Sequence, residues 1–154
     1  MFDYGVRDEN YCYTYKDILD NGQTIEFIFW AWDNNVFSVQ MEIYSKRKKK
    51  SAQFLEATGK CGLQGLILAR LVLKCFIEFL EETTPIGTTK YIMITGSDNR
   101  RMRIYKHFLT KLGFEYTRTK FKFMGMCRDV EGKKSLLFIN IIEGDFYGNS
   151  KDYR

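Results

Sequence analysis

Apolar positions in the first 45 residues fall into three runs that predict antiparallel strands. Residues 10–19 are rich in aromatic and β-branched types and end at Asp20-Asn21-Gly22, a strong hairpin-turn signal. Thr24–Trp32 is apolar on both faces, as expected of a central strand. After the turn Asp33-Asn34-Asn35, residues Val36–Tyr44 alternate between apolar and polar positions. The three runs therefore predict a meander.

A long apolar helix follows this meander after a polar connection over residues 46–56. Apolar residues at helical spacing run from about Cys61 to Glu82 and cover more than one stripe, so we expect burial over much of the helix circumference. The glycines of Thr58–Gly65 predict a turn that opens this helix. The segment Thr83–Thr89, which contains one proline and one glycine, is expected to end it.

Shorter elements make up the second half of the chain. Tyr91–Thr95 is a short apolar run that predicts a buried strand. Arg100–Leu112 has the spacing of an amphipathic helix, and Gly113 is expected to end it in a left-handed conformation. Phe114–Arg128 and Lys134–Ile142 predict two further strands.

The predicted element order is β-β-β-α-β-α-β-β, which indicates an α+β fold with a mixed, mostly antiparallel sheet. A strand, a buried helix and a strand in succession imply a right-handed crossover and one parallel strand pair. The length of 154 residues suits one domain, which we place at residues 1–146, with a loose polar tail over 147–154.

The formal net charge of +5 depends largely on the run Lys46–Lys50, without which the balance is close to neutral. Five consecutive basic residues on a connection could contact the phosphates of a cofactor or the backbone of a nucleic acid. A solvated charge run is the structural alternative. The charge therefore permits an anionic partner without requiring one.

Metal and membrane sites are not expected. The four cysteines contain no C-x-x-C pair, and His107 is the only histidine. The most apolar stretch, Leu63–Leu80, is interrupted by charged residues, so it does not predict a membrane span. Because the chain shows no secretory signal, we expect a reducing cytoplasm.

Two segments resemble the GNAT family of acetyl-CoA-dependent N-acetyltransferases, and the resemblance covers about residues 24–142. Its strongest part is Ser97-Asp98-Asn99-Arg100-Arg101, followed by Tyr105 and then by Leu112-Gly113-Phe114. The resemblance implies a β-α-β-α-β-β core flanked by helices. The small, Lys-, Tyr- and Phe-rich chain is also similar to GNAT-like proteins of tailed bacteriophages, which would place it in the host cytoplasm.

The resemblance implies acetyl-CoA as the cofactor. In GNAT proteins a loop with the motif R/Q-x-x-G-x-G/A holds the pyrophosphate at the start of the buried helix. The best match is Gly59-Lys60-Cys61-Gly62-Leu63-Gln64, in which only Gly62 fits the motif. Structural glycines that allow close packing are the alternative. The implied cofactor-binding residues are Gly59, Lys60, Cys61, Gly62, Leu63, Asn99 and Arg101.

The same resemblance implies Glu42 as general base and Tyr105 as general acid. An ordinary solvated carboxylate is the alternative for Glu42, and a core tyrosine is the alternative for Tyr105. The family tyrosine usually precedes Gly-Phe by about one turn, a position that Leu109 occupies here.

Three functions follow from these patterns. The first is transfer of an acetyl group from acetyl-CoA to a primary amine on a small molecule or protein. The second is a catalytically inactive GNAT fold that binds a protein or nucleic acid, which the incomplete motif favours. The third is a nucleic-acid binder that acts through Lys46–Lys50 and the arginines near residue 100.

Overall fold

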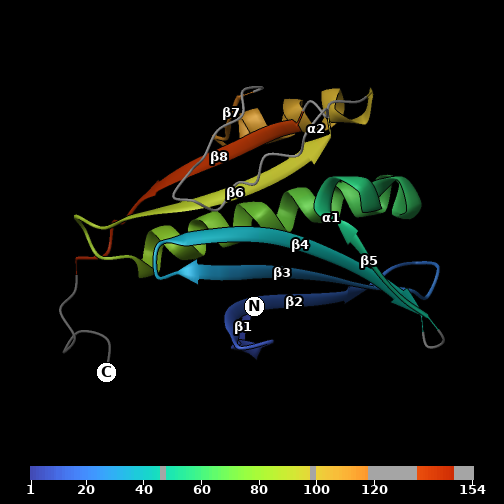
Figure 1. Ribbon diagram of the computed structural model, residues 1–154, viewed down its shortest axis with the longest axis horizontal. Helices are drawn as coiled ribbons and strands as arrows, with labels where there is room; N and C mark the ends of the chain where they lie inside the picture. The colour runs from blue at the N-terminus through green and yellow to red at the C-terminus, as the bar shows by residue number, and fades with distance from the viewer. Residues whose placement is uncertain (46–47, 98–99, 118–134, 148–154) are drawn as a thin grey trace.

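The computed structural model describes residues 1–45, 48–97, 100–117 and 135–147, and it shows an α+β fold (Figure 1). One eight-stranded sheet and two helices make up this part of the chain. The α+β class predicted from the sequence is therefore confirmed. The elements are β1 (Asp3–Arg7), β2 (Asn10–Ile18), β3 (Thr24–Asp33), β4 (Val36–Ser45), β5 (Lys48–Gln53), α1 (Phe54–Thr83), β6 (Thr89–Ser97), α2 (Arg100–Lys111), β7 (Glu115–Thr117) and β8 (Ser135–Glu143).

The sheet has the strand order β1-β2-β3-β4-β6-β8-β7, and β5 forms an additional pair with β4. Neighbouring strands are antiparallel except β4 and β6, which run parallel. The chain between β4 and β6 includes α1, so the predicted parallel pair across the apolar helix is confirmed.

The predicted meander is also confirmed, as strands β2, β3 and β4. Its first turn contains Gly22 at a φ of 83°, a conformation that glycine adopts without a side-chain clash. The Gly22 amide donates to the carbonyl of Leu19 at 2.9 Å. In the second turn the Asn35 amide donates to Oδ1 of Asp33 at 2.6 Å. The turn residues thus set the register of both hairpins.

Two strands were missed by the sequence prediction. β1 pairs with β2 on the outer edge of the meander, and β5 pairs with β4. Residues 46–56 were expected to be a polar connection. That expectation is wrong for Lys48–Gln53, which form β5, and for residues 54–56, which begin α1, while residues 46 and 47 lie outside the described part. The sequence of neither strand shows the apolar alternation that the prediction relied on, and the side chains of β1 are mostly exposed.

The predicted turn at Thr58–Gly65 is wrong. Helix α1 begins at Phe54, directly after β5, and continues without interruption through this segment. Glycine disfavours a helix by about 1 kcal/mol per residue, and the long apolar face of α1 offsets such a cost through packing. Because Gly59, Gly62 and Gly65 are three residues apart, they lie along one side of the helix.

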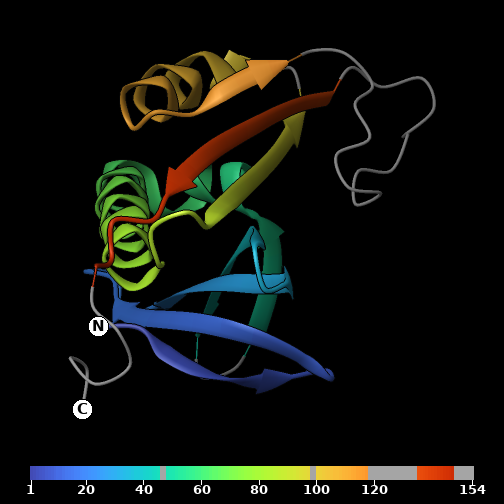
Figure 2. The same cartoon turned by 90° about the vertical axis from the view of Figure 1, so that its left-hand side faces the viewer.

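The main core lies between the sheet and the two helices, which are on the same side of the sheet in Figure 2. The ring of Phe76 on α1 stacks on Phe29 of β3 with centroids 3.8 Å apart. Tyr105 and Leu109 of α2 belong to the same cluster of buried side chains. One face of α1 is buried, as expected, but Ile67 and Leu71 are 60% and 51% exposed, so the burial predicted over much of the circumference is too broad.

The end of α2 matches the prediction. Gly113 has a φ of 98°, and the Phe114 amide donates to the carbonyl of Leu109 at 3.0 Å. Strand β7 follows and ends at Thr117, so most of the predicted strand Phe114–Arg128 lies outside the described residues. β8 corresponds to the predicted strand Lys134–Ile142.

Candidate functional site

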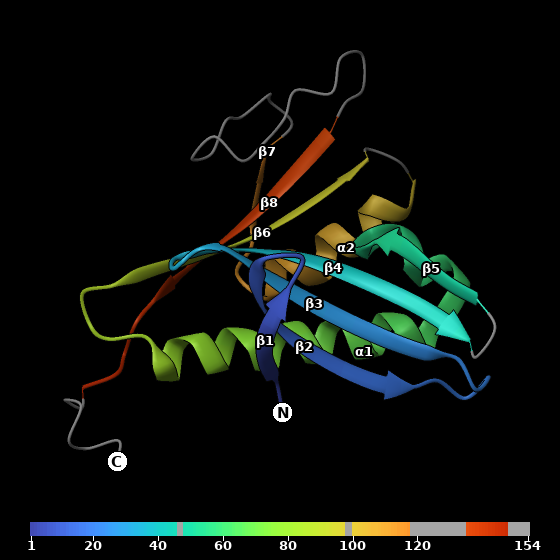
Figure 3. The same ribbon diagram turned by 60° about the horizontal axis from the view of Figure 1, so that its bottom comes forward.

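The parallel pair of β4 and β6 separates soon after it begins. Its ladder joins Val36–Ser38 to Tyr91–Met93, after which β4 continues to Ser45 and β6 to Ser97. Beyond this ladder, β6 stays with β8 while β4 turns away from it (Figure 3). The carboxyl-terminal halves of two neighbouring parallel strands therefore diverge.

Helix α1 begins close in space to the point where β4 and β6 separate. On β4, Gln40 lies two residues beyond the last residue paired with β6, and its partner on β5 is Gln53. The next residue, Phe54, is the first of α1. The first four amide groups of a helix have no partner within the helix and carry a favourable dipole for anions. A helix start suited to an anion thus lies close to the diverging strands.

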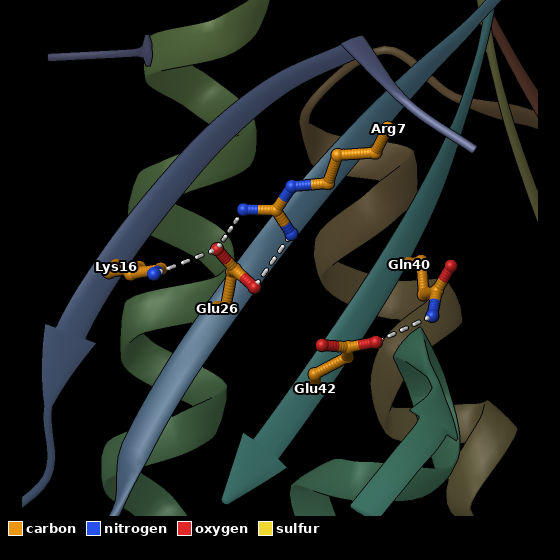
Figure 4. A network of polar contacts seen from close by, with 5 residues as sticks. All are labelled: Arg7, Lys16, Glu26, Gln40 and Glu42. Atoms are coloured by element: carbon orange, nitrogen blue, oxygen red, sulfur yellow. Dashed lines mark hydrogen bonds and ion pairs between the residues drawn. The ribbon is translucent and has the colours of Figure 1, made fainter. Parts of the chain in front are cut away.

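Two buried carboxylates, Glu26 and Glu42, lie on the sheet face that points away from α1 (Figure 4). Side chains alternate between the two faces of a strand. The neighbours Phe27 on β3 and Met41 on β4 belong to the core under the helices, so the two glutamates face the other side. Glu26 and Glu42 are paired in the β3–β4 register, with exposed fractions of 1% and 6%.

Arg7 of β1 reaches over the sheet to Glu26. Its two terminal nitrogens donate to the two carboxylate oxygens of Glu26 at 3.1 and 2.9 Å, a bidentate arrangement. Lys16 of β2 adds an ion pair at 3.6 Å. The hydrogen bonds to Glu26 raise the pKa of Arg7 above its ordinary value. Glu26 is therefore a buried carboxylate that is paired with two cationic side chains.

Glu42 belongs to a row of polar side chains on β4. Nε2 of Gln40 donates to Oε1 of Glu42 at 3.2 Å, and Nε1 of Trp30 donates to Oε1 of Gln40 at 2.8 Å. Two residues before Gln40 on the same strand, Oγ of Ser38 accepts a hydrogen bond from Nε1 of Trp32. The hydrogen bond from Gln40 therefore orients the Glu42 carboxylate. Glu42 lies on β4, the strand that diverges from β6.

Tyr105 lies on α2 and is 5% exposed. Its ring meets Phe108 edge to face, with centroids 5.9 Å apart, inside the main core. Glu42 faces the opposite side of the sheet from this core. The placement of Tyr105 thus fits the structural alternative of a core tyrosine.

The five residues predicted to cradle a pyrophosphate lie within α1 and not in a loop. Gly59–Leu63 follow Phe54 by five to nine positions, so their amide groups lie in the body of the helix. Arg101 is the second residue of α2, and Asn99 lies outside the described residues. The structure gives no loop at the predicted motif.

The sequence prediction missed Glu26 and Arg7. Glu26 is the only charged residue inside the otherwise apolar run Thr24–Trp32, and this isolation was the available signal. A charged residue in a central strand is rarely buried unless it is paired. Arg7 is 19 residues away from Glu26 in the sequence and carries no comparable signal.

No three His, Cys, Asp or Glu side chains gather where they could hold a metal ion within the described part of the chain. Nor does any helix described there have the length and apolar character needed to cross a membrane. No protein-family model, curated protein or solved structure matches the chain.

Proposed function

We propose that the chain is an acetyl-CoA-dependent N-acetyltransferase that acts on a primary amine. The observation that carries this proposal is the separation of β4 and β6 after the ladder of Val36–Ser38 with Tyr91–Met93. Beyond this ladder Gln40–Ser45 of β4 pair with β5, so the backbone groups proposed for a narrow, extended ligand are those of β6 on the side that faces β4. The pantetheine arm of coenzyme A is such a ligand, and the chain's resemblance to GNAT proteins implies the same cofactor.

The position of α1 supports a phosphate site at its first turn. The helix begins next to Gln53, which is paired with Gln40 near the separation of the strands. The amide groups at a helix start attract phosphate oxygens. In this proposal the first turn of α1 takes the task that the sequence assigned to Gly59–Leu63.

Glu42 is the proposed general base. An amine must lose a proton before its nitrogen attacks the thioester carbonyl, and a positioned carboxylate can accept that proton directly or through water. Glu42 lies on β4, beyond the ladder with β6 and held by Gln40. The leaving thiolate then needs a proton, which water can supply; the resemblance implies Tyr105 for this step, but its ring lies in the main core on the side of the sheet opposite Glu42.

Calorimetric titration with acetyl-CoA tests the proposal. Saturable heat is expected, with a dissociation constant below about 1 mM. Thr95 is exposed on β6 just beyond the ladder, so Thr95→Trp places a bulky ring beside the separation and should abolish the heat. Lys111→Trp, an exposed change at the end of α2, is the matched control and should leave binding unchanged. No heat with the unaltered chain would reject the proposal.

A second candidate is an inactive protein of the same fold that binds a macromolecule. It is favoured by the helical conformation of Gly59–Leu63, because the loop expected to cradle the pyrophosphate is absent there. This candidate predicts no response to acetyl-CoA. If Lys48–Lys50 contact a nucleic acid, affinity should fall with salt and be lost when these lysines are replaced by glutamine.

A further inference from the structure

Strand β1 is an open edge of the sheet. Within the described part of the chain it pairs with β2 alone, and Figure 1 shows it at the outer end of the strand order. The outer side of an edge strand presents backbone amide and carbonyl groups that can pair with a further strand. Lysine, proline and bulges commonly protect such edges. The five residues of β1 include neither lysine nor proline, and they pair with β2 in an uninterrupted register.

The turn that joins β1 to β2 determines which backbone groups point outward. It consists of residues 8–9, with φ values of 48° and 67°, and it is flanked by the pair of Arg7 and Asn10. In a two-residue hairpin the flanking residues exchange backbone hydrogen bonds, and bonded and non-bonded pairs alternate from there along the strands. Every second residue of β1, counted from Arg7, therefore directs its backbone groups toward β2. Between them, Tyr4 and Val6 direct theirs to the open side.

The apolar side chains of β1 lie on the helix side of the sheet. Tyr4 is paired with Tyr13, whose ring packs against the main core, and Val6 shares the face of Tyr4 by strand alternation. Tyr4 and Val6 are each 59% exposed. The ring of Tyr4 also stacks on that of Tyr11 with centroids 5.6 Å apart. An exposed apolar strip thus runs along the open edge, where an added strand would cover it.

The other face of β1 carries one charge of each sign, separated by a glycine. Asp3 is exposed at the start of the strand, and Arg7 lies at its end. The contacts of Arg7 with Glu26 use two of the guanidinium donors, and this group has further donors. Gly5 does not have a positive φ, and a Cβ at Gly5 would meet nothing within 4 Å. Neither the backbone conformation nor the described packing therefore requires glycine there.

We propose that β1 pairs with β1 of a second copy of this chain, antiparallel and with Gly5 at the centre. In this register Asp3 lies opposite the partner's Arg7. Tyr4 lies opposite the partner's Val6, and the symmetry repeats both contacts. Facing opposite charges and facing aromatic and β-branched side chains both stabilise antiparallel strands. The proposal does not depend on acetyl transfer, because it concerns the far edge of the sheet from β6.

The backbone pattern agrees with this register. The outward groups of Tyr4 and of the partner's Val6 meet as a hydrogen-bonded pair, while the two copies of Gly5 form a non-bonded pair. Cα atoms approach to about 4.5 Å in a non-bonded pair, a close approach that glycine permits. A slide of two residues, the smallest that keeps the bonding pattern, leaves Asp3 opposite glycine or beyond the strand. The charges therefore favour one register.

Sedimentation equilibrium of the full chain from about 1 to 500 μM tests the pairing. The average mass should rise from that of one chain toward that of two, with a dissociation constant of about 10–100 μM, because five residues from each copy make a small interface. Val6→Lys, and Asp3→Lys opposite the partner's Arg7, should each weaken association by about tenfold or more. Ile18→Lys is the matched control, since Ile18 is 70% exposed on β2 beyond the residues that pair with β1. A single chain at every concentration, or equal association of both β1 variants and the control, would overturn the proposal.

A disulfide tests the register. Gly5→Cys places a thiol in open space, and the Cα separation of a non-bonded pair lies within the range of disulfides. With oxidised glutathione as the oxidant, this variant should form a dimer linked through position 5, as identified by peptide mass spectrometry. Val6→Cys is the control, because its two copies lie diagonally, about 7–8 Å apart, beyond the reach of a disulfide. Linkage at position 6 that equals or exceeds linkage at position 5 would overturn the register, and linkage at neither position would overturn the pairing.

Discussion

Glu26 and Glu42 lie directly opposite each other on β3 and β4, and both are buried on the sheet face away from the helices. Like charges at paired positions of a sheet destabilise it. Arg7 and Lys16 offset this repulsion by holding Glu26 in ion pairs. The edge strand β1 therefore stabilises the face on which the proposed base lies.

Arg7→Ala should lower the free energy of unfolding by about 2 kcal/mol, because it leaves the buried Glu26 without its bidentate partner. The value is set below that of a fully buried pair, since the Arg7 side chain is 37% exposed. Lys16→Ala is the control and should cost less than about 1 kcal/mol. Urea unfolding measures both changes, and equal losses would contradict the role given to Arg7.

Gly62→Ala should raise the free energy of unfolding by about 0.5–1 kcal/mol, because alanine favours a helix over glycine. The opposite result, a loss of stability, is expected if this segment is a turn that requires glycine. Gly22→Ala provides the matched control. Gly22 has a φ of 83° and open space around it, so alanine there should destabilise through the backbone alone.

The stability effect of Glu81→Gln should depend on pH. Burial, together with repulsion from Asp145, raises the pKa of Glu81 in the folded chain. The charged carboxylate therefore costs stability above this pKa, and protonation removes the cost as pH falls through it. Glutamine should stabilise the chain slightly at pH 7, by less than about 0.5 kcal/mol since Glu81 is partly exposed, and have no effect near pH 3. Thermal unfolding across this range measures the difference.

Glu42→Gln should lower kcat/KM for acetyl transfer to an amine by about 100-fold or more at neutral pH. The amide is nearly the same size as the carboxylate but cannot accept the proton. Ser38→Ala alters the same polar row without removing a base, so it is the control and should lose far less activity. Equal losses in the two variants would contradict the role of Glu42 as base.

The sequence was sufficient to predict those elements that are determined by residues close together in the chain. The Asp20-Asn21-Gly22 turn, the apolar helix and the Gly113 helix end were predicted from residues close together in the chain. The edge strands β1 and β5 were not predicted, since they are placed by pairing with a neighbouring strand and their sequences show no apolar alternation. The turn at Thr58–Gly65 was wrong because glycine propensity is a weak signal beside a long buried face.

The candidate site was less accessible to prediction for a related reason. Glu42 was named because the resemblance implies a glutamate on the strand before the buried helix, but its position opposite Glu26 depends on strand register. The contact of Glu26 with Arg7 joins residues 19 positions apart through two strand pairs. Such relations arise from tertiary pairing, which a single sequence does not show.

Hydrogen exchange with and without acetyl-CoA tests the central claim most directly, because it locates the ligand on the backbone. Saturating acetyl-CoA is expected to slow exchange by about tenfold or more at Ile94–Ser97 of β6 and in the first turn of α1, with β1 and β2 unchanged. Unchanged exchange at Ile94–Ser97, or slowing confined to β1 and β2, would contradict the proposal that the diverging strands β4 and β6 receive the cofactor.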